Sequence, residues 1–195
     1  MKVLYFHGFA SAGSSGTATH LRNMLYEYGV EVISPDIPVK PSEALAHLRL
    51  LVAEQKPDLI VGTSMGGLYT ELMYGVPRIM VNPSFHMARH LTFQGMGRHT
   101  FFNKRQDGAR DFVVDKEMIA QFKEVEKESF KGVNAQEKEI VWGLFGKNDK
   151  FVNCQPDFKK AYGTEHFQIF DGEHRLNDTV LKRDIFPLIK KILNL

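Results

Sequence analysis

The 195-residue sequence predicts an α/β fold of three layers, in which helices cover both faces of a mostly or wholly parallel sheet of about six strands. Two observations predict it. Short apolar runs recur along the chain without polar alternation, which is typical of strands buried on both faces. Helical segments separate most of these runs, and alternating strands and helices favour right-handed crossovers within one sheet. The length fits one domain, 1–195.

The expected strands are the apolar runs, and several of them are followed by Gly, Pro, Asn or Asp, the residues that favour turns. They cover 3–6, 30–33, 59–61, 79–81, 140–145 and 167–170.

The expected helices carry apolar residues at spacings of three and four. They cover 17–28, 42–55, 65–74 and 178–193, and Ser42 is the expected N-cap of the second.

One interval, 84–139, is much longer than the other connections. Connections of that length usually carry extra helices or a functional lid. Met118, Phe122 and Val125 form an apolar stripe that indicates a helix within the interval. We expect 84–139 to form a cap or lid insertion over a site, and an irregular surface excursion is the alternative.

Composition excludes several classes of protein. Lys and Arg total 25 and Asp and Glu total 23, so the net charge of +2 lacks the basic excess of a nucleic-acid-binding protein. No apolar run is long enough for a membrane span, and the N-terminal run is too short for a signal peptide. Cys154 is the only cysteine, so it forms no internal disulfide, and we expect it to be a small structural residue of a cytoplasmic protein.

The segment 62–66, Gly-Thr-Ser-Met-Gly, follows the third expected strand directly and leads into a helix. It fits G-x-S-x-G, in which glycines permit a sharp turn that exposes the serine above the end of the sheet. Ser64 is therefore the candidate nucleophile. The alternative is a tight turn whose serine only caps the helix.

An acid and a histidine should follow the serine along the chain. Asp149 lies just past the fifth expected strand and His174 just past the sixth. Both then lie at the carboxyl edge of a parallel sheet, where such folds build their sites. His166 opens the sixth strand and is at the wrong edge, while Asp171 is too close in sequence to His174 to approach its ring.

The first expected strand ends at His7-Gly8-Phe9. Acyl transfer needs two N–H donors for the oxyanion, and we expect the backbone N–H groups of Phe9 and Met65 to supply them. The alternative is that Gly8 is only a turn residue. The glycine-rich run 12–16 lacks the lysine and the spacing of a nucleotide-binding loop.

These motifs, together with G-x-x-D-x-x-V around Asp149 and G-x-H at 172–174, resemble the α/β-hydrolase superfamily over nearly the whole chain outside 84–139. The short chain most closely resembles the small bacterial YqiA/YcfP-like esterases. The first two strands of larger members are missing, which agrees with a sheet of about six strands. The interval 84–139 matches no known lid, so the resemblance implies no particular substrate.

The sequence therefore predicts a serine esterase or thioesterase that acts on small acyl esters and needs no cofactor. A catalytically inactive binding protein of the same fold and an intracellular serine peptidase are the alternatives. We expect Phe93, Phe101 and Phe102 of the interval to contact the substrate. His86 and His90 have the spacing of a helical metal pair but lack an accompanying carboxylate, so we expect surface histidines and no metal site.

Overall fold

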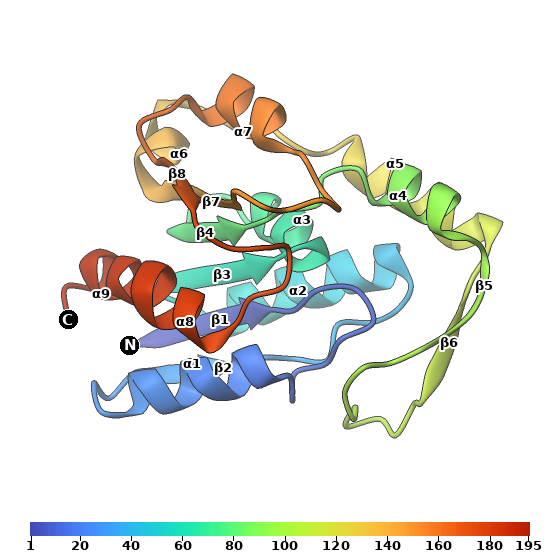
Figure 1. Cartoon of the computed structure of the whole chain (residues 1–195), viewed down its shortest axis with the longest axis horizontal. Coiled ribbons are helices and arrows are strands. Elements are labelled where there is room, and N and C mark those ends of the chain that lie inside the picture. Colours follow the sequence, from blue (N-terminus) through green and yellow to red (C-terminus); the bar gives the residue numbers. More distant parts are fainter.

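The computed structural model describes residues 1–195 apart from the side chain of Gln94, and six parallel strands form its central sheet in the order β2-β1-β3-β4-β7-β8 (Figure 1). This confirms the predicted α/β class and the number of strands. The carboxyl ends of all six strands meet at one edge, where the chain leaves each strand for its next loop. The strands are β1 (Lys2–Phe6), β2 (Glu31–Ile33), β3 (Leu59–Thr63), β4 (Arg78–Val81), β7 (Val141–Gly146) and β8 (Phe167–Phe170).

Helices cover both faces of the sheet because successive strand residues point to opposite sides. Val3 and Tyr5 of β1 pack toward the layer of α1 (Gly16–Tyr26), whereas Leu4 and Phe6 pack toward the other layer. That second layer contains α2 (Pro41–Gln55), α3 (Met65–Glu71), α5 (Lys116–Glu126) and α7 (Gln155–Tyr162).

The C-terminal segment completes the layer of α1, but it is not the single regular helix that the sequence predicts over 178–193. It divides into α8 (Asp178–Val180), a π-helical turn (Leu181–Ile185) and α9 (Phe186–Leu193). Pro187 has no N–H to donate to the carbonyl four residues earlier, and its ring crowds that carbonyl. A local π turn relieves both problems.

Two other helix ends differ from the prediction. Helix α3 ends at Glu71 rather than at 74, because Leu72 and Met73 form tighter bonds to carbonyls three residues back. Helix α2 begins at Pro41, a favoured first position, so Ser42 is not its N-cap and instead donates to Gln121 Oε1 at 3.0 Å.

The interval 84–139 contains α4 (Met87–Gln94), a hairpin of β5 (Gly97–Thr100) and β6 (Asp111–Val114), α5, and most of α6 (Ala135–Ile140). The helix predicted from Met118, Phe122 and Val125 is α5, which packs between α2 and α4. The antiparallel hairpin projects beyond the sheet (Figure 1). None of the described helices is both long and apolar enough to cross a membrane.

The turn of this hairpin lies against the loop that follows β1. The Phe102 N–H donates to the Ala10 carbonyl at 2.8 Å, and Ser11 Oγ donates to Asn103 Oδ1 at 3.0 Å. The interval is therefore fastened to the body at the carboxyl edge of the sheet.

Candidate active site

Ser64 lies at a strained turn between β3 and α3, with φ 54° and ψ −119°. Backbone angles in this region are costly for a residue with a side chain, and they persist where the surroundings enforce them. Gly62 and Gly66 make the turn possible. A Cβ at Gly62 would collide with the Gly66 carbonyl, and one at Gly66 would collide with the carbonyl of Phe6 on β1.

The side chains of Ser64, His174 and Asp149 form one chain of hydrogen bonds across three loops. The distance from Ser64 Oγ to His174 Nε2 is 3.0 Å, and that from His174 Nδ1 to Asp149 Oδ2 is 2.7 Å. A carboxylate only accepts, so Nδ1 carries the proton that it donates. In the neutral imidazole, Nε2 is then the acceptor for the Ser64 hydroxyl.

The carboxyl of Asp149 is held in its ionised form. Burial raises its pKa, but the hydrogen bond and charge of His174 and the N–H groups of Phe151 and Val152 outweigh burial, so the pKa lies below its ordinary value. A fixed negative charge at this position can orient the imidazole and stabilise its protonated form.

Asn82 holds the histidine loop in place, a role that the sequence analysis missed. It follows β4 with φ 46° and is buried. Its Nδ2 donates to the carbonyls of Glu173 and His174 at 3.0 and 3.1 Å, and its Oδ1 accepts from the Gly146 N–H at 2.6 Å. One side chain thus ties the end of β7 to the loop that carries His174.

The loop after β1 approaches Ser64 closely at Gly8, where a Cβ would lie 3.3 Å from Ser64 Cβ. Among the described residues, the N–H groups of Phe9 and Met65 donate to no loop carbonyl. Both are thus available to a bound group. Phe9 follows the residue that approaches Ser64 most closely, and Met65 follows Ser64 directly. Their role as oxyanion donors stays a prediction.

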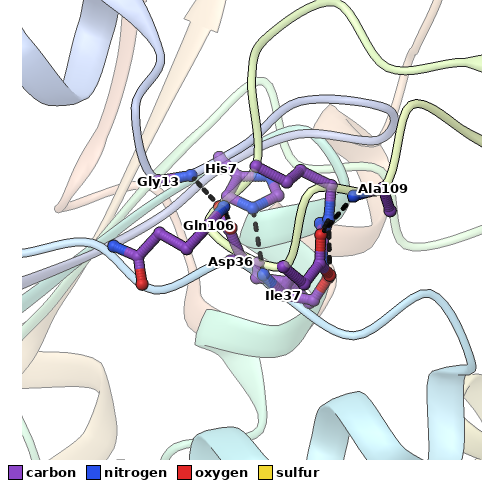
Figure 2. Close-up of polar contacts among 8 residues, drawn as sticks. His7, Gly13, Asp36, Ile37, Gln106 and Ala109 are labelled. Atoms are coloured by element: carbon purple, nitrogen blue, oxygen red, sulfur yellow. Dashed lines mark hydrogen bonds and ion pairs between the residues drawn. The ribbon is translucent and has the colours of Figure 1, made fainter.

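The side chain of His7 joins this loop to the segment after β2, and its bond to Ile37 is drawn in Figure 2. Its Nδ1–H donates to the Gly8 carbonyl at 2.9 Å, and its Nε2 accepts from the Ile37 N–H at 3.1 Å. Burial lowers the pKa of His7 to about 4, which keeps the ring neutral and preserves both bonds.

Asp36 and Arg105 extend this network to the hairpin. No sequence pattern pointed to this structural role for either residue. Asp36 accepts from the Gly13 N–H at 2.8 Å and from the Gln106 N–H at 2.5 Å (Figure 2). Buried Arg105 donates to the Ile37 carbonyl at 3.1 Å. The loops after β1 and β2 and the turn of the hairpin are therefore one hydrogen-bonded unit.

A cavity of about 800 Å³ opens beside Ser64 and His174. Residues of the loop after β1, of the loop after β8, of α4 and of the hairpin line it, among them Phe9, Met87, His90, His99, Phe102 and Arg175.

The three phenylalanines predicted to contact substrate lie in different environments. Phe102 lines the cavity, and the Arg175 guanidinium lies 5.0 Å from the centre of its ring. Phe101 packs against Phe112 and beneath Arg105, and Phe93 is 80% exposed on α4. Of the three, only Phe102 is among the described residues that line the cavity.

A family described as "Uncharacterised protein family (UPF0227)" matches residues 2–190. Solved structures of low sequence identity share the whole fold. Est1E from Butyrivibrio proteoclasticus is 16% identical, with a TM-score of 0.70 over 100% of this chain and 88% of that one. Alpha/beta hydrolase domain-containing protein 10 from mouse is 14% identical, with a TM-score of 0.64 over 99% and 89%.

The monoacylglycerol lipase of Paleococcus ferrophilus is 15% identical, with a TM-score of 0.64 over 99% of this chain and 94% of that one. These likenesses show that the chain has the α/β-hydrolase fold.

Proposed function

The chain belongs to the uncharacterised protein family UPF0227, and we propose that it is a serine hydrolase that cleaves small acyl esters or thioesters. The observation that carries the proposal is the chain of hydrogen bonds from Ser64 through His174 to Asp149, on a strained turn beside a cavity. A serine that only capped a helix would need neither the histidine nor the strain.

The proposed reaction follows from the protonation states. His174 Nε2 takes the proton of Ser64 Oγ as the oxygen attacks the acyl carbon, and Asp149 stabilises the imidazolium that results. The imidazolium then gives its proton to the leaving alcohol or thiol, and the acyl group stays on Ser64. His174 next deprotonates a water molecule, which releases the acid and restores the serine.

The N–H groups of Phe9 and Met65 are the proposed donors to the oxyanion. His7 supports this assignment for Phe9, because the Gly8 carbonyl and the Phe9 N–H belong to one planar peptide. A hydrogen bond that holds the carbonyl on one side turns the N–H to the opposite side.

We propose that 84–139 acts as a cap that selects the substrate. Met87 and His90 of α4 and Arg98, His99 and Phe102 of the hairpin line the cavity beside Ser64. Fold alone does not select a substrate, so the ester class is supported only by this partly apolar cavity of about 800 Å³ and by names such as that of the monoacylglycerol lipase.

Covalent labelling tests the nucleophile. A fluorophosphonate should attach to one site in the wild type, because Ser64 Oγ displaces fluoride from phosphorus. Ser64→Ala should lose both labelling and about 10⁶-fold in kcat on an acyl ester. Ser42→Ala, which changes an exposed serine of α2, is the matched control and should behave as wild type.

Retained turnover in folded Ser64→Ala would overturn the proposal. Wild-type protein that neither labels nor hydrolyses any ester or thioester would support the inactive binding protein instead. Cleavage confined to a peptide panel would support the peptidase.

A further inference from the structure

We propose that His86, Cys154 and Asp157 form a binding site for one zinc-class divalent cation at the junction of α4 and α7. The site is separate from the Ser64 cavity and does not depend on the proposed hydrolase activity. It departs from the sequence-based expectation that His86 is a surface histidine outside any metal site, because a carboxylate, Asp157, lies beside His86 in space.

The three ligand atoms already surround a common point. The imidazole nitrogen, the thiol sulfur and the carboxylate oxygen all lie within 4.8 Å of one another. A point therefore exists within about 2.8 Å of all three, whereas bonds from zinc to these atoms are about 2.0–2.3 Å long. Each atom needs to move by less than about 1 Å, which side-chain rotation supplies.

The ligand side chains come from the N-termini of two helices, α4 and α7. Cys154 is the N-cap residue of α7 and Asp157 follows three residues later, so both side chains lie on one face of the first turn. His86 occupies the corresponding place before α4. Neither Cys154 nor His86 caps its own helix with its side chain. The Cys154 thiol instead bonds the Phe85 backbone, and His86 Nε2 lies 3.3 Å from Asp157 Oδ2, so a metal would replace these two contacts.

The chemistry of the set favours zinc. A thiolate and an imidazole are preferred ligands of zinc, and a carboxylate is a common third. His86 is 53% exposed and Asp157 is one-third exposed, which leaves an entry path and a fourth position for water. Calcium and magnesium prefer sites made of oxygen atoms alone.

The surroundings are negative. Burial is the main cause that raises the pKa of Cys154 to about 12. A hydrogen bond to the Phe85 backbone opposes it, and the charges of Asp157, Asp149 and Glu126 raise the pKa further. The same carboxylates attract a cation. On binding, the metal takes the sulfur electron pair and the thiol proton leaves to solvent, so one proton is released for this ligand.

A bound ion would join the start of the interval 84–139 to the helix that follows the Asp149 loop. Helix α4 carries Met87 and His90, which line the cavity. The cation would therefore limit how far this wall moves relative to the body of the protein.

Cobalt(II) is the probe, because its thiolate complexes absorb strongly. Chelator-treated full-length protein is titrated with cobalt chloride. The proposal expects one cobalt per chain, a sulfur-to-cobalt charge-transfer band and its loss when zinc displaces cobalt. Cys154 is the only cysteine of the chain, so the band reports this residue alone.

Two variants keep the thiol and remove another ligand. His86→Gln and Asp157→Asn should each weaken cobalt binding at least about tenfold, the lower limit seen even for partners outside the first coordination sphere. His47→Gln changes an exposed histidine of α2 and should bind as wild type does.

Absence of the band in the wild type would overturn the proposal. Wild-type cobalt affinity in His86→Gln and Asp157→Asn would overturn it as well, because the thiol alone would then bind metal. Circular dichroism establishes that each variant is folded.

Discussion

Asn82 and Ser64 show how individual residues at this edge combine an unusual backbone with a specific partner. Both have positive φ, 46° and 54°, and the side chain of each reaches the histidine loop. An asparagine adopts this conformation readily, whereas a serine does so at a cost. The strain is therefore concentrated on the residue whose hydroxyl must face His174.

Asp149→Asn should lower kcat about 10⁴-fold on an acyl ester while the fold survives. With its oxygen turned toward Phe151 and Val152, the amide still accepts their N–H bonds. It then places its NH₂ group against His174 Nδ1, which favours the wrong tautomer of the imidazole. It also carries no charge to stabilise the imidazolium. Steady-state rates measured at one pH provide the test.

The matched control is Asp171→Asn. Asp171 is exposed, and its Oδ1 lies 3.5 Å from Asn148 Nδ2, so the change should cost less than about tenfold in kcat. If Asp171→Asn proves the more damaging of the two, the acid has been wrongly assigned.

Asn82→Asp should lower the free energy of unfolding by about 1–3 kcal/mol at neutral pH. The new carboxylate would face the carbonyls of Glu173 and His174 with no proton to donate. Urea unfolding gives the free energy, and kcat should fall too because the loop of His174 loses its support. Wild-type values for both would show that this loop does not depend on Asn82.

At the residue scale, the candidate site could be predicted where a residue's place just after a strand indicates where its side chain lies. The ends of β3, β7 and β8 select Ser64, Asp149 and His174, whose side chains lie within hydrogen-bonding distance of each other. Their catalytic roles stay predictions. Asn82 was missed because an asparagine after a strand usually forms a turn, and its partners appear only when β4 and β7 are neighbours.

At the scale of elements, the buried strands were predictable because burial on both faces leaves continuous apolar runs. The hairpin was not. Its first strand, Gly97–Thr100, contains one glycine and three polar residues, and its side chains alternate between half-buried and exposed. The π turn before Pro187 was not predicted either. One extra residue in a single turn hardly changes the spacing of apolar residues along the helix.

The hairpin should determine acyl-chain preference through Phe102. Phe102→Ala removes an aromatic ring from the cavity, so kcat/KM for longer relative to shorter acyl esters should change by roughly tenfold or more. Phe93→Ala removes an equally large ring that is 80% exposed on α4, and the ratio should stay within about twofold of wild type. A graded series of esters measures both. Equal ratios in the two variants would exclude Phe102 as the residue that sets chain-length preference.

Across the whole molecule, the two edges of the sheet differ in chemistry. The amino edge contains the buried ion pair of Arg78 and Glu137, beside Glu71, whose pKa burial raises. The carboxyl edge contains the candidate active site and the network of His7, Asp36 and Arg105. The carboxyl edge therefore combines the strained Ser64 with a network of polar side chains, beside the residues of 84–139 that line the cavity.

The stability of the whole protein should fall as pH decreases below the ordinary pKa of histidine, in part through His7. Burial lowers the pKa of His7 from 6.5 to about 4, so the unfolded chain binds this proton more readily than the folded protein does. Between these two values the unfolded state gains protons first, and stability is lost as pH falls. The neutral ring is also the form that accepts from the Ile37 N–H, so protonation would release the loop that carries Phe9.

The variant His7→Gln removes the titrating imidazole, so it isolates the contribution of His7 to the pH dependence of stability. The wild type should exceed the variant in free energy of unfolding at about pH 7.5, and this difference should shrink by about 2 kcal/mol at about pH 5. Urea unfolding at both pH values gives the difference, in which groups common to both proteins cancel. His47→Gln, on the exposed face of α2, should show no such change. A difference that stays constant or grows toward acid pH would mean that folded His7 accepts a proton as readily as the unfolded chain does, and that its hydrogen bonds to Gly8 and Ile37 do not depend on a neutral ring.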